Sequence, residues 1–296
     1  MRHYTFLLLL LLPTFSTLAQ EPETLLVAVD YSFSHIHDTT NRSNPLKENM
    51  TLNVAAHTAS YRRSPLIPTN TATTATAASS AGAAPTAVRV VAGGPMAVVY
   101  APGYTEYELV QSPATNVLKI FTSIGMSAYV IEQPLPRIDW QIGQQTKTIG
   151  DYTCQQATGT YAGRQYIAWF TTELPFRYGP WKLSGLPGLI LEAADANGEV
   201  SFTCLAIRKP TEETKHRYGR NSYIPASEQA VAKAKEAFEE NPVATMQSQL
   251  PQGAPAPRLA YRDLNGKSTS GEDAQPLIDE KRKIARRFIN NPLERK

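Results

Sequence analysis

Apolar and polar residues alternate along much of the chain, and this pattern predicts β-strands. Between Leu25 and Phe33 the odd positions are apolar, while the even positions become polar at Asp30 and Ser32. A period of two is typical of a strand with one buried face. The same argument, with turn residues between the segments, predicts further strands at 50–61, 97–100, 105–111, 117–122, 128–132, 152–161, 164–172, 189–194 and 199–207.

Short turns join several of these segments. Ala162–Gly163 connects two strongly alternating stretches, and Asn197–Gly198 is a dipeptide typical of tight hairpins. Residues 139–149 are predicted to form a short hairpin of their own.

Only two segments show helical spacing. One begins after Ser227, a typical N-cap, and is predicted to end at Pro242, which cannot continue a helix. The other spans about 276–290 and gathers apolar residues on one face. Because strands outnumber helices and do not alternate with them, we expect a mainly β fold. The expected form is a curved antiparallel sheet, a half-barrel similar to the lipoprotein-carrier fold, with two short helices.

The ends of the chain and one internal segment indicate its organisation. Basic Arg2 and His3 precede an apolar run over 6–12 and a small-residue cleavage site at 17–19, which predicts a signal peptide over 1–19. Residues 20–296 are then expected to form one exported domain, periplasmic or associated with the outer membrane. No later apolar run approaches ~20 residues, so no membrane span is expected in the mature chain. Residues 69–87 are almost entirely Ala, Thr and Ser, which predicts a disordered insertion over about 64–95.

Composition adds little about partners. The formal net charge is only +3, and basic residues concentrate at 281–296. Export and the lack of a basic–aromatic groove pattern argue against nucleic acid. Cys154 and Cys204 could pair after export or remain two buried strand cysteines.

A search for catalytic or metal patterns gives weak candidates. Ser184 has Lys182 two positions before it, where a nucleophile elbow needs glycine. Glu173 and Glu192 lie among apolar neighbours in the sequence and could be the catalytic carboxylates of a hydrolase. Alternatively, each could form an ion pair with an arginine such as Arg164 or Arg177. His35 and His37 share one strand face but lack a third ligand, so we expect neither a metal nor a cofactor.

The glycine-rich stretch 179–195 is better explained by a turn. Pro187 and Gly188 suit the two central positions of a type II turn, with positive φ at the glycine, and Gly185 allows a second bend. Two interpretations of the surrounding apolar residues stay open: a plug in the β core, or an exposed lip for a ligand or partner. The candidate binding residues are Trp181, Leu183, Leu186 and Leu189.

These residues carry a resemblance to a known family. The resemblance rests on the preceding segments "DWQI" and "IGDYTCQQATGTYAGRQYIAWFTTELPF", on the closing "NPLE", and on the hexapeptide Gly185, Leu186, Pro187, Gly188, Leu189, Ile190. Together these segments resemble the GLPGLI family of exported Bacteroidetes proteins. The resemblance implies an envelope protein with one domain. It brings no established activity and no catalytic residues. It also implies that Asp38-Thr39-Thr40 resembles an O-glycosylation acceptor.

Three functional hypotheses follow. The first is a non-catalytic binding module for a lipid, a lipopeptide or another envelope partner such as an outer-membrane protein. The second is a hydrolase of unknown substrate. The third is a structural or assembly factor at the outer membrane, whose basic C-terminal helix meets acidic headgroups.

Overall fold

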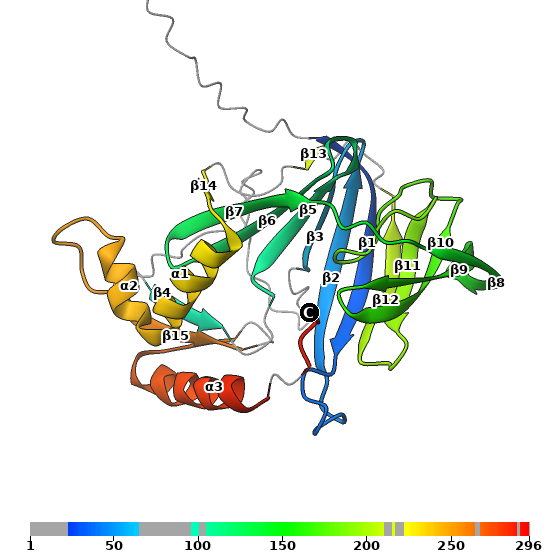
Figure 1. Cartoon of the computed structure of the whole chain (residues 1–296). Coiled ribbons are helices and arrows are strands. Elements are labelled where there is room, and N and C mark those ends of the chain that lie inside the picture. The colour runs from blue at the N-terminus through cyan, green and yellow to red at the C-terminus, as the bar shows by residue number, and fades with distance from the viewer. Residues whose placement is uncertain are drawn as a thin grey trace, which may run out of the picture.

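The computed structural model describes residues 23–64, 96–100, 105–209, 215–216, 222–263, 267–288 and 291–295, with only the backbone described for 215–216 and 282–288. The predicted signal peptide lies outside these residues, as does the predicted insertion apart from its first residue. The fold is mainly β, as expected, and its large sheet is curved but does not close into a barrel (Figure 1).

The large sheet contains thirteen strands. Twelve follow the order β14-β7-β6-β5-β3-β2-β1-β12-β11-β10-β9-β8, and β13 pairs with β1. All these pairs are antiparallel except β14 with β7. The strands are β1 (Glu23–His35), β2 (Leu46–Ala55), β3 (Ala59–Arg63), β5 (Tyr107–Ser112), β6 (Val117–Ile124), β7 (Ser127–Pro134), β8 (Gln141–Ile149), β9 (Tyr152–Tyr161), β10 (Arg164–Thr171), β11 (Leu189–Asp195), β12 (Val200–Arg208), β13 (Lys215–His216) and β14 (Ile224–Pro225).

A smaller unit packs beside the β5–β7 end of this sheet (Figure 1). It combines a three-stranded sheet with three helices, where the sequence predicted only two. Its strands are β4 (Met96–Tyr100), β15 (Arg258–Arg262) and β16 (Ser268–Ser270), and its helices are α1 (Glu228–Glu240), α2 (Pro242–Ser248) and α3 (Ala274–Phe288). Short 3₁₀ turns occur at Pro113–Thr115 and Gly271–Asp273. Within the described residues, no helix is long and apolar enough to cross a membrane.

Helix α2 was missed because Pro242 has a different role from the one predicted. The Ser227 side chain caps α1 by accepting from the Ala230 N–H, as expected. Pro242 does not merely end α1, because it is the first residue of α2, where its missing N–H costs nothing. The Asn241 side chain caps this second helix by accepting from the Ala244 N–H.

The hairpin predictions had mixed outcomes. Ala162 and Gly163 both take positive φ, 48° and 69°, and form the tight turn between β9 and β10. The predicted hairpin at 139–149 is wrong. Residues from Gln141 onward form one strand, β8, which pairs with β9 across a turn at Gly150–Asp151.

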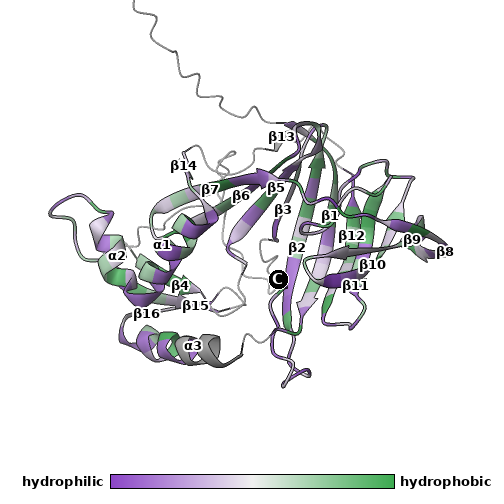
Figure 2. Ribbon diagram, viewed as in Figure 1, coloured by the Kyte–Doolittle hydropathy of each residue, from purple (hydrophilic) through white to green (hydrophobic). Residues whose placement is uncertain are grey.

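Hydropathy alternates along the strands of the large sheet (Figure 2). This alternation builds two cores on one face of the sheet. The larger core takes the inward residues of β1, including Val29 and Tyr31, and the loop between β10 and β11. The smaller one joins Ile131 of β7 to the helices. Ile120 on β6 contacts both, so the two cores are contiguous. Val110 and Phe121 point to the opposite face, against Tyr223.

Candidate functional site

The loop between β10 and β11 packs into the larger core. Trp181, Leu183, Leu186 and Leu189 are all buried, with at most 2% of their surface exposed. The interpretation of these four as an exposed lip is therefore wrong in this structure, and the alternative of a core plug holds. The loop is fixed by backbone bonds: Leu189 N donates to Leu174 O, and Ile190 N to Tyr178 O.

The type II turn predicted at Pro187 and Gly188 is wrong, because the positive φ lies at Gly185 and not at Gly188. Gly185 takes a left-handed φ of +99°, whereas Gly188 does not have positive φ. A Cβ on Gly188 would lie 2.0 Å from the carbonyl oxygen of Thr171. Glycine is thus needed at 188 because the loop backbone passes directly against the end of β10, while the left-handed φ lies at Gly185.

Trp181 holds an unusual backbone position. Its φ is +55°, a conformation that costs free energy for a bulky side chain. Surrounding contacts hold it there: Gln111 Nε2 donates to its carbonyl at 2.8 Å, and its ring packs on Tyr161 and Phe202. Backbone strain of this kind is often found where a side chain must be aimed at a site.

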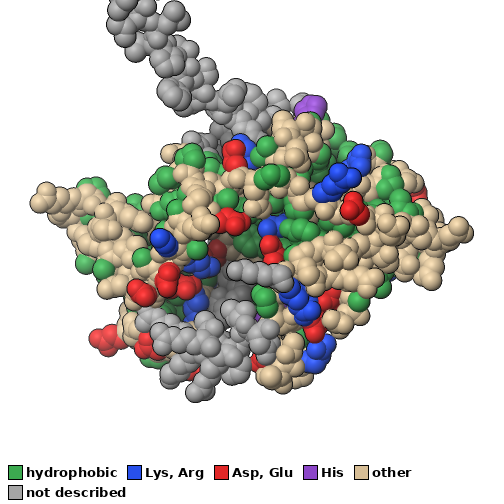
Figure 3. Space-filling model, in the orientation of Figure 1, with side chains coloured by type: hydrophobic (Ala, Val, Ile, Leu, Met, Phe, Trp, Pro, Cys, Tyr) green, Lys and Arg blue, Asp and Glu red, His purple; other side chains and the backbone are tan. Residues whose placement is uncertain are grey.

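Trp181 forms part of the wall of a narrow, closely packed aromatic pocket that has no room for a water molecule. Five rings contribute, and Phe33 stacks on Phe202 with ring centroids 5.1 Å apart. We call this the aromatic pocket; its lining residues are Phe33, Met50, Tyr61, Thr105, Tyr107, Trp181, Phe202 and Leu293. In the space-filling view, hydrophobic side chains lie within a hollow that charged side chains of both signs border (Figure 3).

The pocket carries polar groups in an apolar setting. The Tyr61 hydroxyl is buried, and among the described residues it has no hydrogen-bond partner. Burial raises the pKa values of Tyr61 and Tyr107, so both phenols stay protonated. Buried Glu48 accepts hydrogen bonds from the hydroxyl and the backbone N–H of Thr105. It also forms an ion pair with Arg63. Burial raises the pKa of Glu48, against the Thr105 hydrogen bonds and the Arg63 charge.

A second feature lies beside the pocket, where the segment Asn291–Arg295 crosses the end of the large sheet. Arg164, whose side chain is fully buried, is its centre. The Arg164 guanidinium donates to Asp195 Oδ2 at 2.6 Å and to Glu199 Oε2 at 3.1 Å. Its other donors reach the Leu293 and Pro292 carbonyls and Asn291 Oδ1, at 3.2, 2.8 and 2.6 Å. Five contacts thus match the five N–H groups of an arginine.

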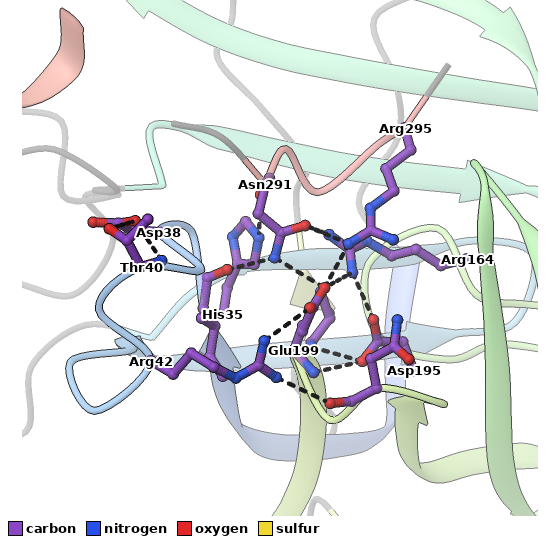
Figure 4. Close-up of polar contacts among 12 residues, drawn as sticks. His35, Asp38, Thr40, Arg42, Arg164, Asp195, Glu199, Asn291 and Arg295 are labelled. Atoms are coloured by element: carbon purple, nitrogen blue, oxygen red, sulfur yellow. Dashed lines mark hydrogen bonds and ion pairs between the residues drawn. The ribbon is translucent and has the colours of Figure 1, made fainter. Parts of the chain in front are cut away.

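We call this group of contacts around Arg164 the clasp; its members are His35, Arg42, Arg164, Asp195, Glu199, Asn291 and Arg295 (Figure 4). Glu199 Oε2 also accepts from Arg295 and Asn291, and its other oxygen accepts from Arg42 at 3.1 Å. Burial alone would raise the pKa of Glu199, but hydrogen bonds from Arg42 and Arg164 and the charge of Arg295 lower it. Asp195 Oδ1 accepts from the backbone N–H groups of Glu199 and Val200, which shapes the β11–β12 turn.

His35 is part of the clasp. His35 Nε2 donates to the Asn291 carbonyl at 2.9 Å. Burial lowers the pKa of His35 to about 4, with smaller effects from Arg164 and His37, so the ring is neutral at pH 7. Among the described residues, no cluster of three or more His, Cys, Asp or Glu side chains could hold a metal.

The three hydrolase candidates each have a different partner among the described residues. Glu192 pairs with Lys147, and Glu173 accepts from the Thr153 backbone N–H at 2.9 Å. The predicted arginine partners are thus wrong, because Arg164 binds Asp195 and Glu199. Ser184 is buried, and within the described part of the chain it makes no hydrogen bond to either glutamate; its carbonyl accepts from Trp140 Nε1.

The two cysteines are free thiols in this structure. Cys154 lies on β9 and Cys204 on β12, with β10 and β11 between them in the sheet. Burial raises the pKa of each thiol to about 11, despite the nearby Lys147 in the case of Cys154. Neither is activated as a nucleophile, because the thiolate is the reactive form.

Sequence reasoning missed both the pocket and the clasp. Members of the clasp are separated by up to 256 residues, as for His35 and Asn291. The only local signals were the two acids that flank the Asn197–Gly198 turn and the polar residues of the closing "NPLER". Neither signal names a partner, so only the fold brings them together.

Comparison with known proteins gives limited matches. The model of a family described as "Protein of unknown function (Porph_ging)" matches residues 161–192, which include the hexapeptide. No curated protein matches. Two solved structures, "Structure of PNGF-II in C2 space group" and "Structure of PNGF-II in P21 space group", have TM-scores of 0.47, with 10% and 12% identity. Each alignment covers 72% of this chain, which spans only 33% of those longer chains. A likeness of this degree supports no inference about function.

Proposed function

We propose that this protein is an exported member of the GLPGLI family and a non-catalytic binding module for a hydrophobic ligand. The aromatic pocket is the observation that carries this proposal. It combines five aromatic rings with one buried hydroxyl, Tyr61, that lacks a partner within the described residues. A buried donor without a partner costs about 1–3 kcal/mol, which a ligand oxygen would offset.

The size of the pocket limits what it can take. Sites for whole small molecules usually enclose about 300–1,000 Å³. The aromatic pocket is far smaller, with no room for even a water molecule in this structure, so its side chains must move apart before one end of a ligand, such as the end of an acyl chain or a single ring, can enter. We therefore propose a lipid or lipopeptide of which one part enters between the rings while the rest stays outside. Such ligands suit a location in the periplasm or at the outer membrane.

A titration with a fluorescent fatty acid would test this function. Tyr61→Phe keeps the ring and removes the hydroxyl. Trp181→Phe replaces the indole in the pocket wall by a smaller aromatic ring. Leu205→Ala is the matched control, because Leu205 is 57% exposed on β12. We expect both pocket variants to weaken binding at least ten-fold and the control to leave it unchanged. Equally negligible binding by the wild type and all three variants would exclude the proposal.

A further inference from the structure

The segment Asn291–Arg295 is held in the way that a protein holds a bound peptide. Its backbone makes bonds at both ends: Asn291 N donates to His37 O at 3.2 Å, and Arg295 N to Ala162 O at 2.9 Å. Three of its carbonyls accept from His35 and Arg164. These contacts join the segment to β1 and β10, far from it in sequence.

The side chains of the segment each contact different groups of the sheet and its loops. Asn291 is 1% exposed, and its amide is used in both directions. Its nitrogen donates to Ile36 O at 2.6 Å, while its oxygen accepts from Arg164 and Arg295. Aspartate would lose the donor and place a second carboxylate beside Glu199. Alanine would leave buried polar groups without partners.

The next positions are also matched. Leu293 packs against the larger core and lines the aromatic pocket. Glu294 pairs with Lys182, which is nearly buried, and Arg295 pairs with Glu199. A Cβ on Gly163 would lie 2.7 Å from Arg295 Cβ, so glycine there leaves room for the segment. The surface beneath the segment thus has places for an amide, an apolar side chain, an acid and a base in order.

We propose that this surface is a peptide-recognition socket, occupied here by the chain's own Asn291–Arg295 and able to bind the same segment of a second copy. The socket comprises His35, Gly163, Arg164, Lys182, Asp195 and Glu199. Pro292 and Glu294 are exposed, so the segment lies at the surface and can leave without opening the sheet. A second copy is the partner because the socket matches this particular sequence.

The experiment uses the full-length chain and a labelled peptide of sequence Asn-Pro-Leu-Glu-Arg. In the full-length variant Leu293→Ala/Arg295→Ala, the internal segment loses its apolar contact and one ion pair, while the socket stays intact. We expect the peptide to bind this variant at least ten-fold more tightly than the wild type, measured by fluorescence anisotropy. The reason is that the wild-type segment competes at the high effective concentration of a tethered ligand.

A matched peptide makes the test specific. The peptide carrying Asn291→Ala should bind at least ten-fold more weakly than the unchanged peptide. If the double variant is not folded by circular dichroism, Arg295→Ala alone, whose side chain is about one-third exposed, replaces it. Failure of the unchanged peptide to bind a folded variant would overturn the proposal. So would equal binding of the two peptides, or equal binding to wild type and variant.

Discussion

The guanidinium of Arg164 donates a hydrogen bond to the backbone carbonyl of Leu293, 129 residues further along the chain. The same arginine pairs with two carboxylates at the β11–β12 turn, Asp195 and Glu199. Leu293 in turn lines the aromatic pocket beside Trp181. One buried cation therefore links the clasp to the pocket, and its removal should affect both.

Arg164→Met should be strongly destabilising. It leaves Asp195 and Glu199 buried without their central partner, a change that costs about 3–5 kcal/mol for a buried ion pair. Urea denaturation would measure the loss. Arg137→Met is the matched control, because Arg137 and Asp139 are 92% and 86% exposed, and its effect should stay within about 0.5 kcal/mol. Similar losses for the two variants would contradict the role assigned to Arg164.

Stability should fall as the pH drops from about 6.5 to about 4, in part through His35. Its pKa is lowered to about 4 in the folded state, so between these values the unfolded chain binds a proton that the folded chain does not. Above pH 6.5 the titration of His35 therefore takes nothing from the free energy of unfolding. By pH 4 it has lowered the free energy of unfolding by about 2–3 kcal/mol. Burial is the main cause of the lowered pKa, and the groups that act on the ring are the Asn291 carbonyl, Arg164, His37 and Asp195.

His35→Gln isolates this effect, because the amide can still donate to Asn291 but does not titrate. The raised pKa values of Glu48 and Glu106 act in the opposite sense and are common to both proteins. Denaturation at pH 7, 5.5 and 4 should show a smaller decline for His35→Gln than for wild type. Parallel curves would exclude His35 as the source.

Gly188→Ala should lower stability by roughly 2 kcal/mol or more, since its Cβ would collide with the Thr171 carbonyl and the strand end must shift. Thermal unfolding would show the change. Gly143→Ala is the control: it also lacks positive φ, and its nearest neighbour, Gln156 Oε1, would be at an ordinary 3.5 Å. A tolerated Gly188→Ala would mean that the close approach at Thr171 is not a constraint.

Two tyrosines on the larger core should respond oppositely to loss of the hydroxyl. Tyr31 donates to the Ile190 carbonyl at 2.6 Å, so Tyr31→Phe should cost about 1–3 kcal/mol. Tyr61→Phe removes a hydroxyl without a partner in the described chain, and should leave the ligand-free protein unchanged or more stable. Denaturation of both variants in parallel would check this. Equal destabilisation would indicate that Tyr61 has a partner.

Both cysteines should be present as slowly reacting thiols. Because burial raises each pKa to about 11, few thiolates exist at pH 8. Alkylation by iodoacetamide should be slow in the folded protein and complete for both residues in denaturant without a reducing agent. Denatured protein that takes up no label would show that Cys154 and Cys204 are paired.

The strands were predictable because each carries its own local signal. Alternation over 25–33 reports the buried face of β1, and a turn such as Ala162–Gly163 needs only its own backbone. The same holds for the Ser227 cap. Mainly β architecture and a curved antiparallel sheet therefore followed from the sequence.

Several failures share a cause, which is that a tertiary contact decided the outcome. Gly188 looked like a turn glycine, but the Thr171 carbonyl is what requires it. Burial of Trp181 and Leu186 depends on the sheet that surrounds the loop, and no neighbour in sequence reports this. Pro242 is a different case. From the sequence alone, a proline that follows the end of one helix cannot be told from a proline that begins the next helix.

The long separations within the clasp have a consequence for folding kinetics. His35 lies at the end of the first strand, and its partner Asn291 is synthesised 256 residues later. Contacts of such sequence separation form slowly, because a large loop must close before they contribute. During this interval Arg164 has its carboxylates but not the carbonyls of 292 and 293. The contacts of residues 291–295 should therefore be among the last to form as the chain folds.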